Sequence, residues 1–386
     1  MTVLDLVASA SAALPGSGAG RTGTAFAPGR CTIVGEHVDY ADGVVVCIAV
    51  HLGIAVAVRE SSDGLWRVRS GVRLVERADP SPCGDAGDLP FATALALRLA
   101  GCDVPALSIG VAATLPEGAG LSSSAALCCA TAAAVLRLLG ARLPAAELCD
   151  VALSAERDIL GVPCGPLDQR AVVLAPAGGA LVLDCRDGGV STVPWLDGYV
   201  LAACHTGDAH DVGGEGYRTR RAQADAALAA IAAGGSVPGR LSYRDVGFAQ
   251  AEALDSRDPL LARRARHIVG ETARAQQCAA ALLDGDAARV GALMTASHAS
   301  LRDEYEVSTA ALDAVVAAAV RVPGCRGARL VGAGFGGTAI ALVEEGSAGA
   351  CLRAMKAALP GGTAGRGGWV LAPAPGLAAL APDVVA

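Results

Sequence analysis

The segment Pro116-Glu-Gly-Ala-Gly-Leu-Ser-Ser-Ser-Ala-Ala126 decides how this chain is interpreted. Gly118 and Gly120 permit backbone conformations that other residues avoid, and they let a ligand approach the main chain closely. The serines lie at the predicted start of an Ala-rich helix that runs to Leu139 and stops at Gly140. Free N–H groups and the positive end of the helix dipole attract phosphate there. The segment predicts a phosphate-binding loop, with an ordinary serine-capped helix as the alternative; it is not the Walker pattern, since no Gly-Lys-Ser/Thr follows.

Strand-like and helix-like stretches alternate on both sides of this loop. Runs rich in Val, Ile and Leu predict strands over residues 32–34, 44–58, 107–115, 171–174, 181–184, 329–331 and 338–343. Helices are predicted from Pro144 to about Leu160 and over residues 216–233, 258–283, 287–293 and 309–320. Mixed elements in both halves predict an α+β fold. We expect the first twenty residues to be a mobile lead-in.

Length and composition limit the classes of protein. A chain of 386 residues suggests two domains at roughly 100–200 residues each, and we place the boundary between residues 1–195 and 196–386. A net charge of -7 argues against nucleic acid as the main partner. The apolar runs stop well short of the ~20 residues that span a bilayer, and no secretory signal is visible. The thirteen cysteines are scattered without a Cys-x-x-Cys pair, which favours reduced core residues in a cytoplasmic protein.

A second group of residues combines charge and apolar surroundings. Arg30 is followed by Gly35-Glu-His-Val-Asp-Tyr40, so four ionisable side chains lie within ten residues beside apolar strands. Burying them without partners or a ligand is costly. Carboxylates and an imidazole can hold several hydroxyls of a polyol by hydrogen bonds, whereas a self-satisfied ion-pair cluster is the alternative. A zinc site is disfavoured because Glu-His-x-Asp lacks the i, i+4 spacing of helical ligands.

Two further loops are weaker signals by themselves. Val162-Pro-Cys-Gly-Pro-Leu-Asp-Gln169 is a rigid loop that presents one acid, Asp168, and suits proton abstraction or charge stabilisation. A helix-capping role for that acid is the simpler interpretation. Gly332-Ala-Gly-Phe-Gly-Gly337 lacks the helix pattern of a dinucleotide fingerprint, so a plain turn between strands is favoured for it.

Together these segments resemble the three ordered motifs of the GHMP kinases, and the segment 162–169 resembles the galactokinase branch of that superfamily. Further similar segments are residues 215–221, 264–269 and 294–307, so the resemblance covers about residues 24–376. It implies a two-domain GHMP kinase fold, with an N-terminal domain like ribosomal protein S5 domain 2, a ferredoxin-like C-terminal domain and the active site between them.

The resemblance also implies roles for individual residues. ATP would bind to Gly118, Gly120, Leu121, Ser122, Ser123 and Ser124, and Mg²⁺ to Ser124 and Glu156. Arg30 and Asp168 would be the catalytic pair, with Asp168 acting as a base or as an electrostatic stabiliser. The sugar would contact Glu36, His37, Asp39, Gly165 and Tyr217. The implied reaction is transfer of the ATP γ-phosphate to the C1 hydroxyl of an aldose, by a monomer or dimer that needs neither nucleic acid nor a membrane.

Departures from the usual galactokinase motif bear on the sugar. Thr32, Val38 and Ala41 replace Asn, Thr and Asn, Cys47 replaces a proline, and His205 stands where Asp is usual, with Asp208 also atypical nearby. Lost polar groups at positions 38 and 41 are expected to alter the wall around the sugar hydroxyls, and such changes shift specificity strongly. We therefore place a modified or longer-chain aldose slightly ahead of D-galactose.

Rival functions within the resemblance are a non-catalytic sugar sensor and a kinase for a non-sugar alcohol such as mevalonate or homoserine. The complete serine motif and Asp168 oppose the sensor. The cluster of Glu36, His37 and Asp39 opposes the non-sugar alcohol, since such a substrate offers no polyol.

Overall fold

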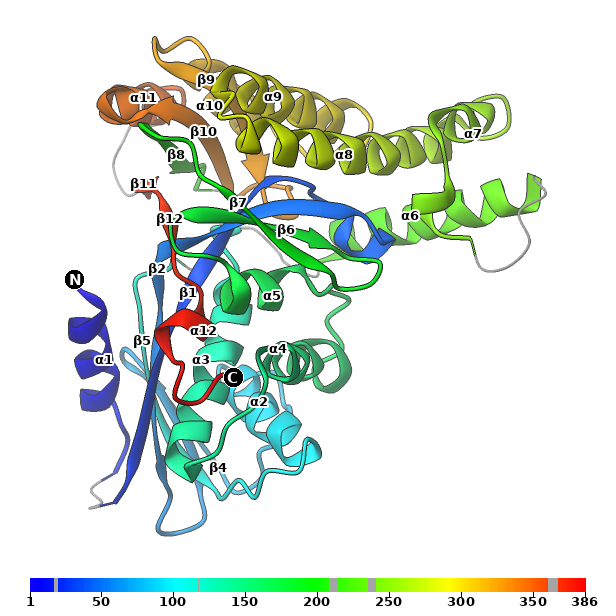
Figure 1. The fold of residues 1–386 in the computed structure, drawn as a ribbon. Coiled ribbons are helices and arrows are strands. Elements are labelled where there is room, and N and C mark those ends of the chain that lie inside the picture. Colours follow the sequence, from blue (N-terminus) through cyan, green and yellow to red (C-terminus); the bar gives the residue numbers. More distant parts are fainter. Residues whose placement is uncertain (17–19, 117, 208–213, 235–240, 360–366) are drawn as a thin grey trace.

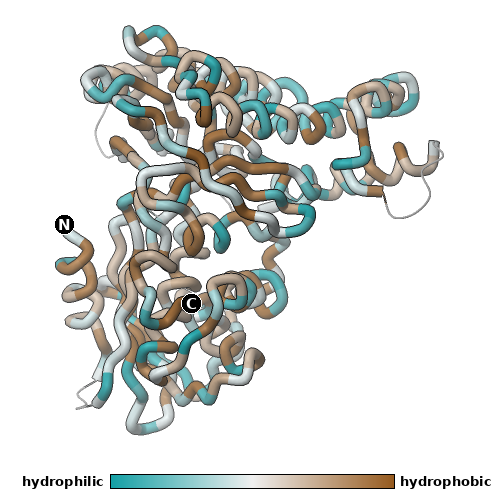
Figure 2. Tube along the Cα trace, in the orientation of Figure 1, coloured by the Kyte–Doolittle hydropathy of each residue, from teal (hydrophilic) through white to brown (hydrophobic). Residues whose placement is uncertain are grey.

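The computed structural model describes residues 1–16, 20–116, 118–207, 214–234, 241–359 and 367–386. They form two sheets with helices packed on both, which confirms the predicted α+β class (Figure 1). Hydrophobic residues run along the central strands, and hydrophilic residues lie on the outer turns of the helices (Figure 2). No helix in the described ranges is long and apolar enough to cross a membrane.

The first sheet is built around a long antiparallel pair, β1 (Thr22–Val34) and β2 (Val44–Glu60). β2 pairs along one part of its length with β5 (Leu107–Ala113) and along another with β6 (Gly179–Asp184). The outer strands are β3 (Trp66–Ser70), β4 (Arg73–Arg77) and β7 (Val190–Pro194). The turn between β1 and β2 carries the charged cluster of residues 35–40, so that cluster lies at one end of the sheet.

Helices cover both faces of this sheet. On one face lies α1 (Val3–Ala12), and on the other lie α2 (Asp88–Leu99), α3 (Ser123–Leu139), α4 (Ala145–Ser154) and α5 (Leu167–Leu174) (Figure 1). α3 is buried nearly all round, and its small Ala and Cys side chains let it lie against β1. A Cβ at Gly23 would lie 1.9 Å from the carbonyl oxygen of Ala134, so this approach requires glycine.

The second sheet has the strand order β11 (Gly368–Leu371), β8 (Tyr199–His205), β10 (Thr338–Glu344), β9 (Cys325–Val331). Its residues alternate between two hydrophobic clusters, so both faces are buried. The helices of this half are α6 (Glu215–Gly234), α7 (Phe248–Ala253), α8 (Pro259–Leu283), α9 (Ala287–Asp303), α10 (Ala310–Ala319) and α11 (Ala348–Ala357).

The last residues return from the second sheet to the first. β12 (Pro373–Ala374) pairs with β2, and α12 (Leu377–Leu380) packs on α5. Asp383 then forms an ion pair with Arg137 of α3 at 2.5 Å. The division at residues 195 and 196 stays a prediction.

Most predicted elements are confirmed, with differences that have local causes. Residues 171–174 are helix rather than strand, because they complete α5, which packs on α4 and on the first sheet. The predicted lead-in is wrong for residues 3–12, which form α1 with a capping box between Thr2 and Asp5. α9 extends ten residues beyond the predicted end at 293, to Asp303.

Candidate active site

A cavity of about 110 Å³ lies where the β1–β2 turn, the segment before α3, the start of α5 and the loop after β9 meet. Its lining includes nearly all the residues singled out by the sequence. They are Arg30, Glu36, His37, Asp39, Gly118, Gly120, Ser122, Ser123, Ser124, Val162, Cys164, Gly165, Leu167, Asp168, Tyr217, Gly332 and Ala333. Two predicted site residues, Leu121 and Glu156, are buried beside the cavity and are not part of this lining.

The predicted phosphate loop has the backbone that its glycines allow. Gly118 and Gly120 have φ of 68° and 70°, and Ser122 at the N-cap of α3 has φ of 59°. A side chain at Gly120 would lie 2.9 Å from the carbonyl oxygen of Val331, so the two glycine-rich loops touch. The Ser122 hydroxyl is buried and has no hydrogen-bond partner among the described residues. An unsatisfied buried donor beside a helix N-terminus suits an anionic ligand.

Arg30 joins this loop to the start of α5. Its Nε donates to Oδ1 of Asp168 at 2.8 Å, and its Nη2 lies 2.6 Å from the same oxygen. Its Nη1 donates to the carbonyl of Gly120 at 2.7 Å, and its backbone N–H donates to the carbonyl of Leu121. Burial disfavours the charged guanidinium, but Asp168 and Glu36 outweigh it and raise the pKa of Arg30. Asp168 keeps 31% of its side-chain surface exposed, so the acid faces the cavity while its partner is buried.

The turn that follows β1 includes a residue, His37, with a backbone conformation that is rare outside glycine. His37 has φ of 62°, a strained conformation for a residue other than glycine, and such strain is typical of ligand sites. Its Nε2 lies 3.0 Å from the carbonyl of Ala333, so Nε2 carries the proton. Its Nδ1 lies 2.9 Å from the hydroxyl of Tyr40, which in turn lies 2.8 Å from that of Tyr305. Hydrogen bonds therefore fix the ring of His37 from both sides.

Carboxylates crowd this part of the cavity. Oε1 of Glu36 accepts the N–H of Gly332 at 2.7 Å. Burial and the neighbouring carboxylates of Asp168 and Glu36 together raise the pKa of Asp39 to about 7, against the lowering effect of Arg30. A Cβ at Gly165 would lie 2.1 Å from Oδ2 of Asp39, so only glycine fits beside this acid. The site thus gathers several acceptors that can bind hydroxyl groups.

Glu156 is a buried acid that contacts Ser124 of the phosphate loop. It belongs to a π-helical turn, Ala155–Ile159, that ends α4, and such turns commonly re-aim a side chain at functional sites. Its Oε2 accepts from Nε2 of Gln169 at 2.5 Å. Burial raises the pKa of Glu156 to about 7, against the lowering effect of hydrogen bonds from Ser124 and Gln169. A carboxylate and a hydroxyl beside a phosphate loop are hard oxygen ligands of the kind that Mg²⁺ prefers.

A buried polar layer behind the cavity was missed by the sequence analysis. Glu271 of α8 accepts from the N–H of Gly35 at 2.9 Å and from the hydroxyl of Ser297 at 2.6 Å. One turn earlier on the same helix, Nε2 of His267 lies 3.2 Å from the carbonyl of Glu36. This helix therefore holds the backbone of the turn at two successive residues, Gly35 and Glu36. A usable signal was Arg329, a charged residue in an otherwise apolar strand, which lies 3.5 Å from Glu36 and 4.0 Å from Glu271.

The departures from the family motif lie outside the cavity lining. Thr32 and Cys47 are cross-strand partners in the register of β1 and β2, so the two changes face one another inside the sheet. Val38 is buried in the second hydrophobic cluster, as is Ala41. The expectation that the changes at positions 38 and 41 alter the wall around the sugar hydroxyls is therefore wrong, because both side chains are buried in the hydrophobic core and neither lines the cavity. Asp208 lies outside the described residues.

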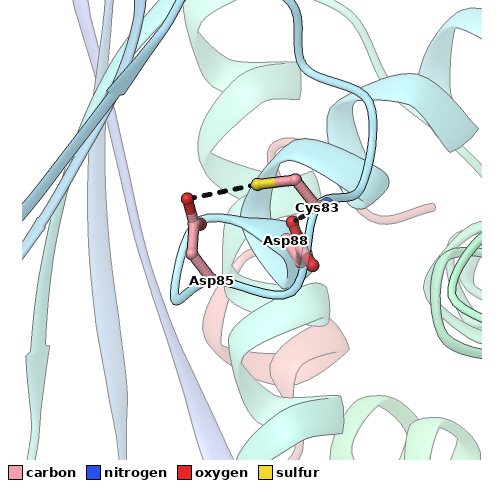
Figure 3. Close-up of side chains that lie close together, drawn as sticks. All are labelled: Cys83, Asp85 and Asp88. Carbon is pink, nitrogen blue, oxygen red and sulfur yellow. Dashed lines mark hydrogen bonds between the residues drawn. The ribbon is translucent and has the colours of Figure 1, made fainter.

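Two other features of the described chain do not add a site. Cys83, Asp85 and Asp88 lie close together (Figure 3), but the carboxylates bind Arg77 and the backbone N–H groups at the start of α2. A larger hollow of about 840 Å³ lies beside Arg59 and Arg67, away from every predicted site residue. Arg67 is already paired within that hollow with Asp63 and Glu76.

Comparisons with known proteins point in one direction. The family description "GHMP kinases N terminal domain" matches residues 88–175, "GHMP kinases C terminal" matches residues 278–361, and "Galactokinase galactose-binding signature" matches residues 17–60. The galactokinase of Roseiflexus sp. is 39% identical over 83% of both chains. That of Homo sapiens is 35% identical, over 83% of this chain and 84% of its own.

Solved structures agree. The crystal structure of Lactococcus lactis galactokinase complexed with galactose has a TM-score of 0.84 and 28% identity, and covers 92% of this chain and 94% of its own. Mevalonate kinase of L. major, at 19% identity, a TM-score of 0.65 and coverage of 94% of this chain and 99% of its own, shares the fold alone.

Proposed function

The chain belongs to the galactokinase branch of the GHMP kinase superfamily and is an ATP-dependent sugar 1-kinase of that type, and we propose that its acceptor is D-galactose. The order of preference from the sequence, which placed another aldose slightly ahead, is thereby reversed. The non-catalytic sensor is set aside, because curated relatives that cover most of the chain are enzymes.

The single observation that carries the choice of galactose is the composition of the cavity lining. Glu36, His37, Asp39, Gly165 and Tyr217 all belong to it, and the departures from the usual motif do not. A site that keeps its hydroxyl-binding groups keeps its discrimination among sugars, because each unmatched polar group is costly.

The proposed chemistry uses few groups of the protein. The C1 hydroxyl oxygen of galactose attacks the γ-phosphorus of ATP, the bond from that phosphorus to the ADP oxygen breaks, and the hydroxyl proton passes to Asp168. Arg30 holds Asp168 in place at 2.6 Å and brings positive charge to the transferred phosphoryl group. Phosphoryl transfer depends mainly on alignment and charge neutralisation, so these roles and the backbone N–H groups at the start of α3 suffice.

We propose that the Ser124 hydroxyl and the Glu156 carboxylate hold Mg²⁺. The buried hydroxyl of Ser122 and the unpartnered Oε1 of Gln169 nearby support a polar ligand in this place. A bound Mg²⁺ would neutralise phosphate oxygens of ATP. The cytoplasmic location and the monomeric or dimeric state stay predictions.

The test is release of ADP with Mg²⁺, ATP and a panel of aldoses. We expect galactose to give a kcat/KM at least about 100-fold above that of glucose, its C4 epimer, because a hydroxyl-binding site rejects a misplaced hydroxyl strongly. A higher kcat/KM with another aldose would refute galactose as the acceptor. Absence of turnover with every aldose, by a folded protein that binds ATP, would refute the kinase function itself.

A further inference from the structure

His205 connects the second sheet to the phosphate loop. It is the last residue of β8, opposite Thr338 at the start of β10, and its backbone N–H donates to the carbonyl of Gly367. Its side chain reaches across to the carbonyl of Gly118, with Nε2 at 3.3 Å from the oxygen.

Two contacts define the hydrogen-bonding roles of the two ring nitrogens. The backbone N–H of Gly207 donates to Nδ1 at 2.9 Å, so Nδ1 is an acceptor without a proton. A carbonyl oxygen only accepts, so Nε2 must carry the proton that binds Gly118. The two contacts together place the donated hydrogen on Nε2.

The hydrogen bond from His205 fixes the orientation of the peptide plane after Gly118, an orientation that the glycine itself leaves open. Glycine at positive φ leaves its flanking peptide planes free to rotate, and an ordered loop needs outside contacts to select one orientation. Since the peptide is planar, fixing the carbonyl of Gly118 also fixes the direction of the next N–H, that of Ala119. Arg30 does the same two residues later by binding the carbonyl of Gly120.

The neighbour of His205 anchors the donor strand. Thr206 donates through its backbone N–H at 2.8 Å and through its hydroxyl at 3.0 Å to the carbonyl of Gly337. The position of the imidazole is therefore set by the second sheet and by the end of the glycine-rich loop 332–337.

We propose that His205 is a positioning residue for ATP, which orients the phosphate loop by donating a hydrogen bond to Gly118. This rests on the proposed role of residues 118–124 in ATP binding. The hydrogen bond from Nε2 to the carbonyl of Gly118 is the observation that carries this proposal.

The test uses two substitutions, His205→Gln and His205→Asn, whose amide groups reproduce the position of Nε2 and of Nδ1 respectively. Gln at position 205 places an N–H near the position of Nε2 and can reach Gly118, whereas Asn places its amide near Nδ1 and cannot. We expect His205→Ala and His205→Asn to raise the KM for ATP about 3- to 10-fold, the range of one net hydrogen bond, with the KM for galactose unchanged. His205→Gln should restore the KM for ATP to within about 2-fold of the unsubstituted value. His51→Ala, an exposed histidine of β2, is the control.

A second readout keeps this test independent of turnover. Binding of a non-hydrolysable ATP analogue with Mg²⁺, measured by calorimetry without sugar, should weaken by the same factor in the Ala and Asn variants. An unchanged affinity in His205→Ala, no recovery in His205→Gln, or an equal rise in the KM for galactose would overturn the proposal. Failure of the unsubstituted protein to phosphorylate galactose would instead refute the proposed function.

Discussion

Oδ1 of Asp168 lies 2.8 Å from Nε and 2.6 Å from Nη2 of Arg30, so one carboxylate oxygen takes up both contacts with the guanidinium. The arginine is buried in β1 and the acid stands at the first turn of α5, so two rigid elements define the distance between them. Rigid support is what a group needs if it is to meet a substrate proton in a fixed geometry.

Replacing Asp168 by its amide should slow turnover strongly while ATP still binds. We expect Asp168→Asn to lower kcat by about 10²- to 10⁴-fold, the usual cost of losing a general base, with the Kd for an ATP analogue within about 2-fold. Asp150→Asn, an exposed acid paired with Arg170 on the outside of α4, is the control. Near-normal kcat in Asp168→Asn would remove this residue from the reaction.

Glu156 should make Mg²⁺ binding depend on pH. Its pKa of about 7 means that Mg²⁺ must displace a proton below that pH, so the apparent Mg²⁺ affinity should fall about tenfold per pH unit below 7 and level off above it. Mg²⁺ activation of turnover at pH 6, 7 and 8 measures this. Since ATP also titrates in this range, the comparison is with Glu156→Gln, which should bind Mg²⁺ weakly and lack the protein's share of the pH dependence. Equal pH dependence in both proteins would exclude Glu156 as a ligand.

Gly165 should be needed for sugar binding rather than for ATP binding. A methyl group there would displace the carboxylate of Asp39, whose Oδ2 lies 2.1 Å from the added Cβ position. We expect Gly165→Ala to raise the KM for galactose about tenfold or more, the cost of a lost hydrogen bond to a charged group, with little change in the KM for ATP. Gly346→Ala, where a Cβ meets open space, is the matched control. A rise confined to the KM for ATP would contradict the assignment of Asp39 to the sugar.

Glu271 should stabilise the fold at neutral pH and lose that effect in acid. Burial disfavours its charge, but Arg274 and Arg329 outweigh burial and lower its pKa from 4.5 to about 2. A depressed carboxyl pKa stabilises the native state above pH 4.5, and the contribution, about 3 kcal/mol, disappears as pH falls from 5 to 2.

Urea unfolding at pH 7 and pH 3 measures this contribution. Glu271→Gln should be less stable than the unsubstituted protein at pH 7, with a smaller loss between pH 7 and pH 3. Glu252→Gln, an exposed residue of α7, should follow the unsubstituted protein. An unchanged pH dependence in Glu271→Gln would show that other groups control acid unfolding.

Local sequence signals were sufficient for much of the fold and most of the cavity lining. The glycines and serines of residues 118–124 carry their conformational preferences with them, and Gly140 ends α3 with φ of 67° as a C-terminal glycine should. The apolar run at 171–174 was misread because its helix depends on packing against α4 and the first sheet, which no short pattern encodes.

The buried polar layer behind the cavity could not be predicted from the sequence for a different reason. Glu271 contacts Gly35 across 236 residues of chain, and only the packing of α8 against the first sheet brings them together. Val38 shows the converse: its neighbours in sequence line the cavity, yet its side chain packs near Gly43 and Thr272. A motif gives the residue types, but the direction of each side chain depends on the fold.

The most direct test of the central claim is identification of the product. The protein is incubated with Mg²⁺, ATP and galactose, and ³¹P and ¹H NMR locate the new phosphate ester. We predict galactose 1-phosphate, formed in equal amount with ADP by the unsubstituted protein and at least about 100-fold more slowly by Asp168→Asn. Phosphate on any other hydroxyl, or galactose 1-phosphate formed equally well by Asp168→Asn, would contradict it.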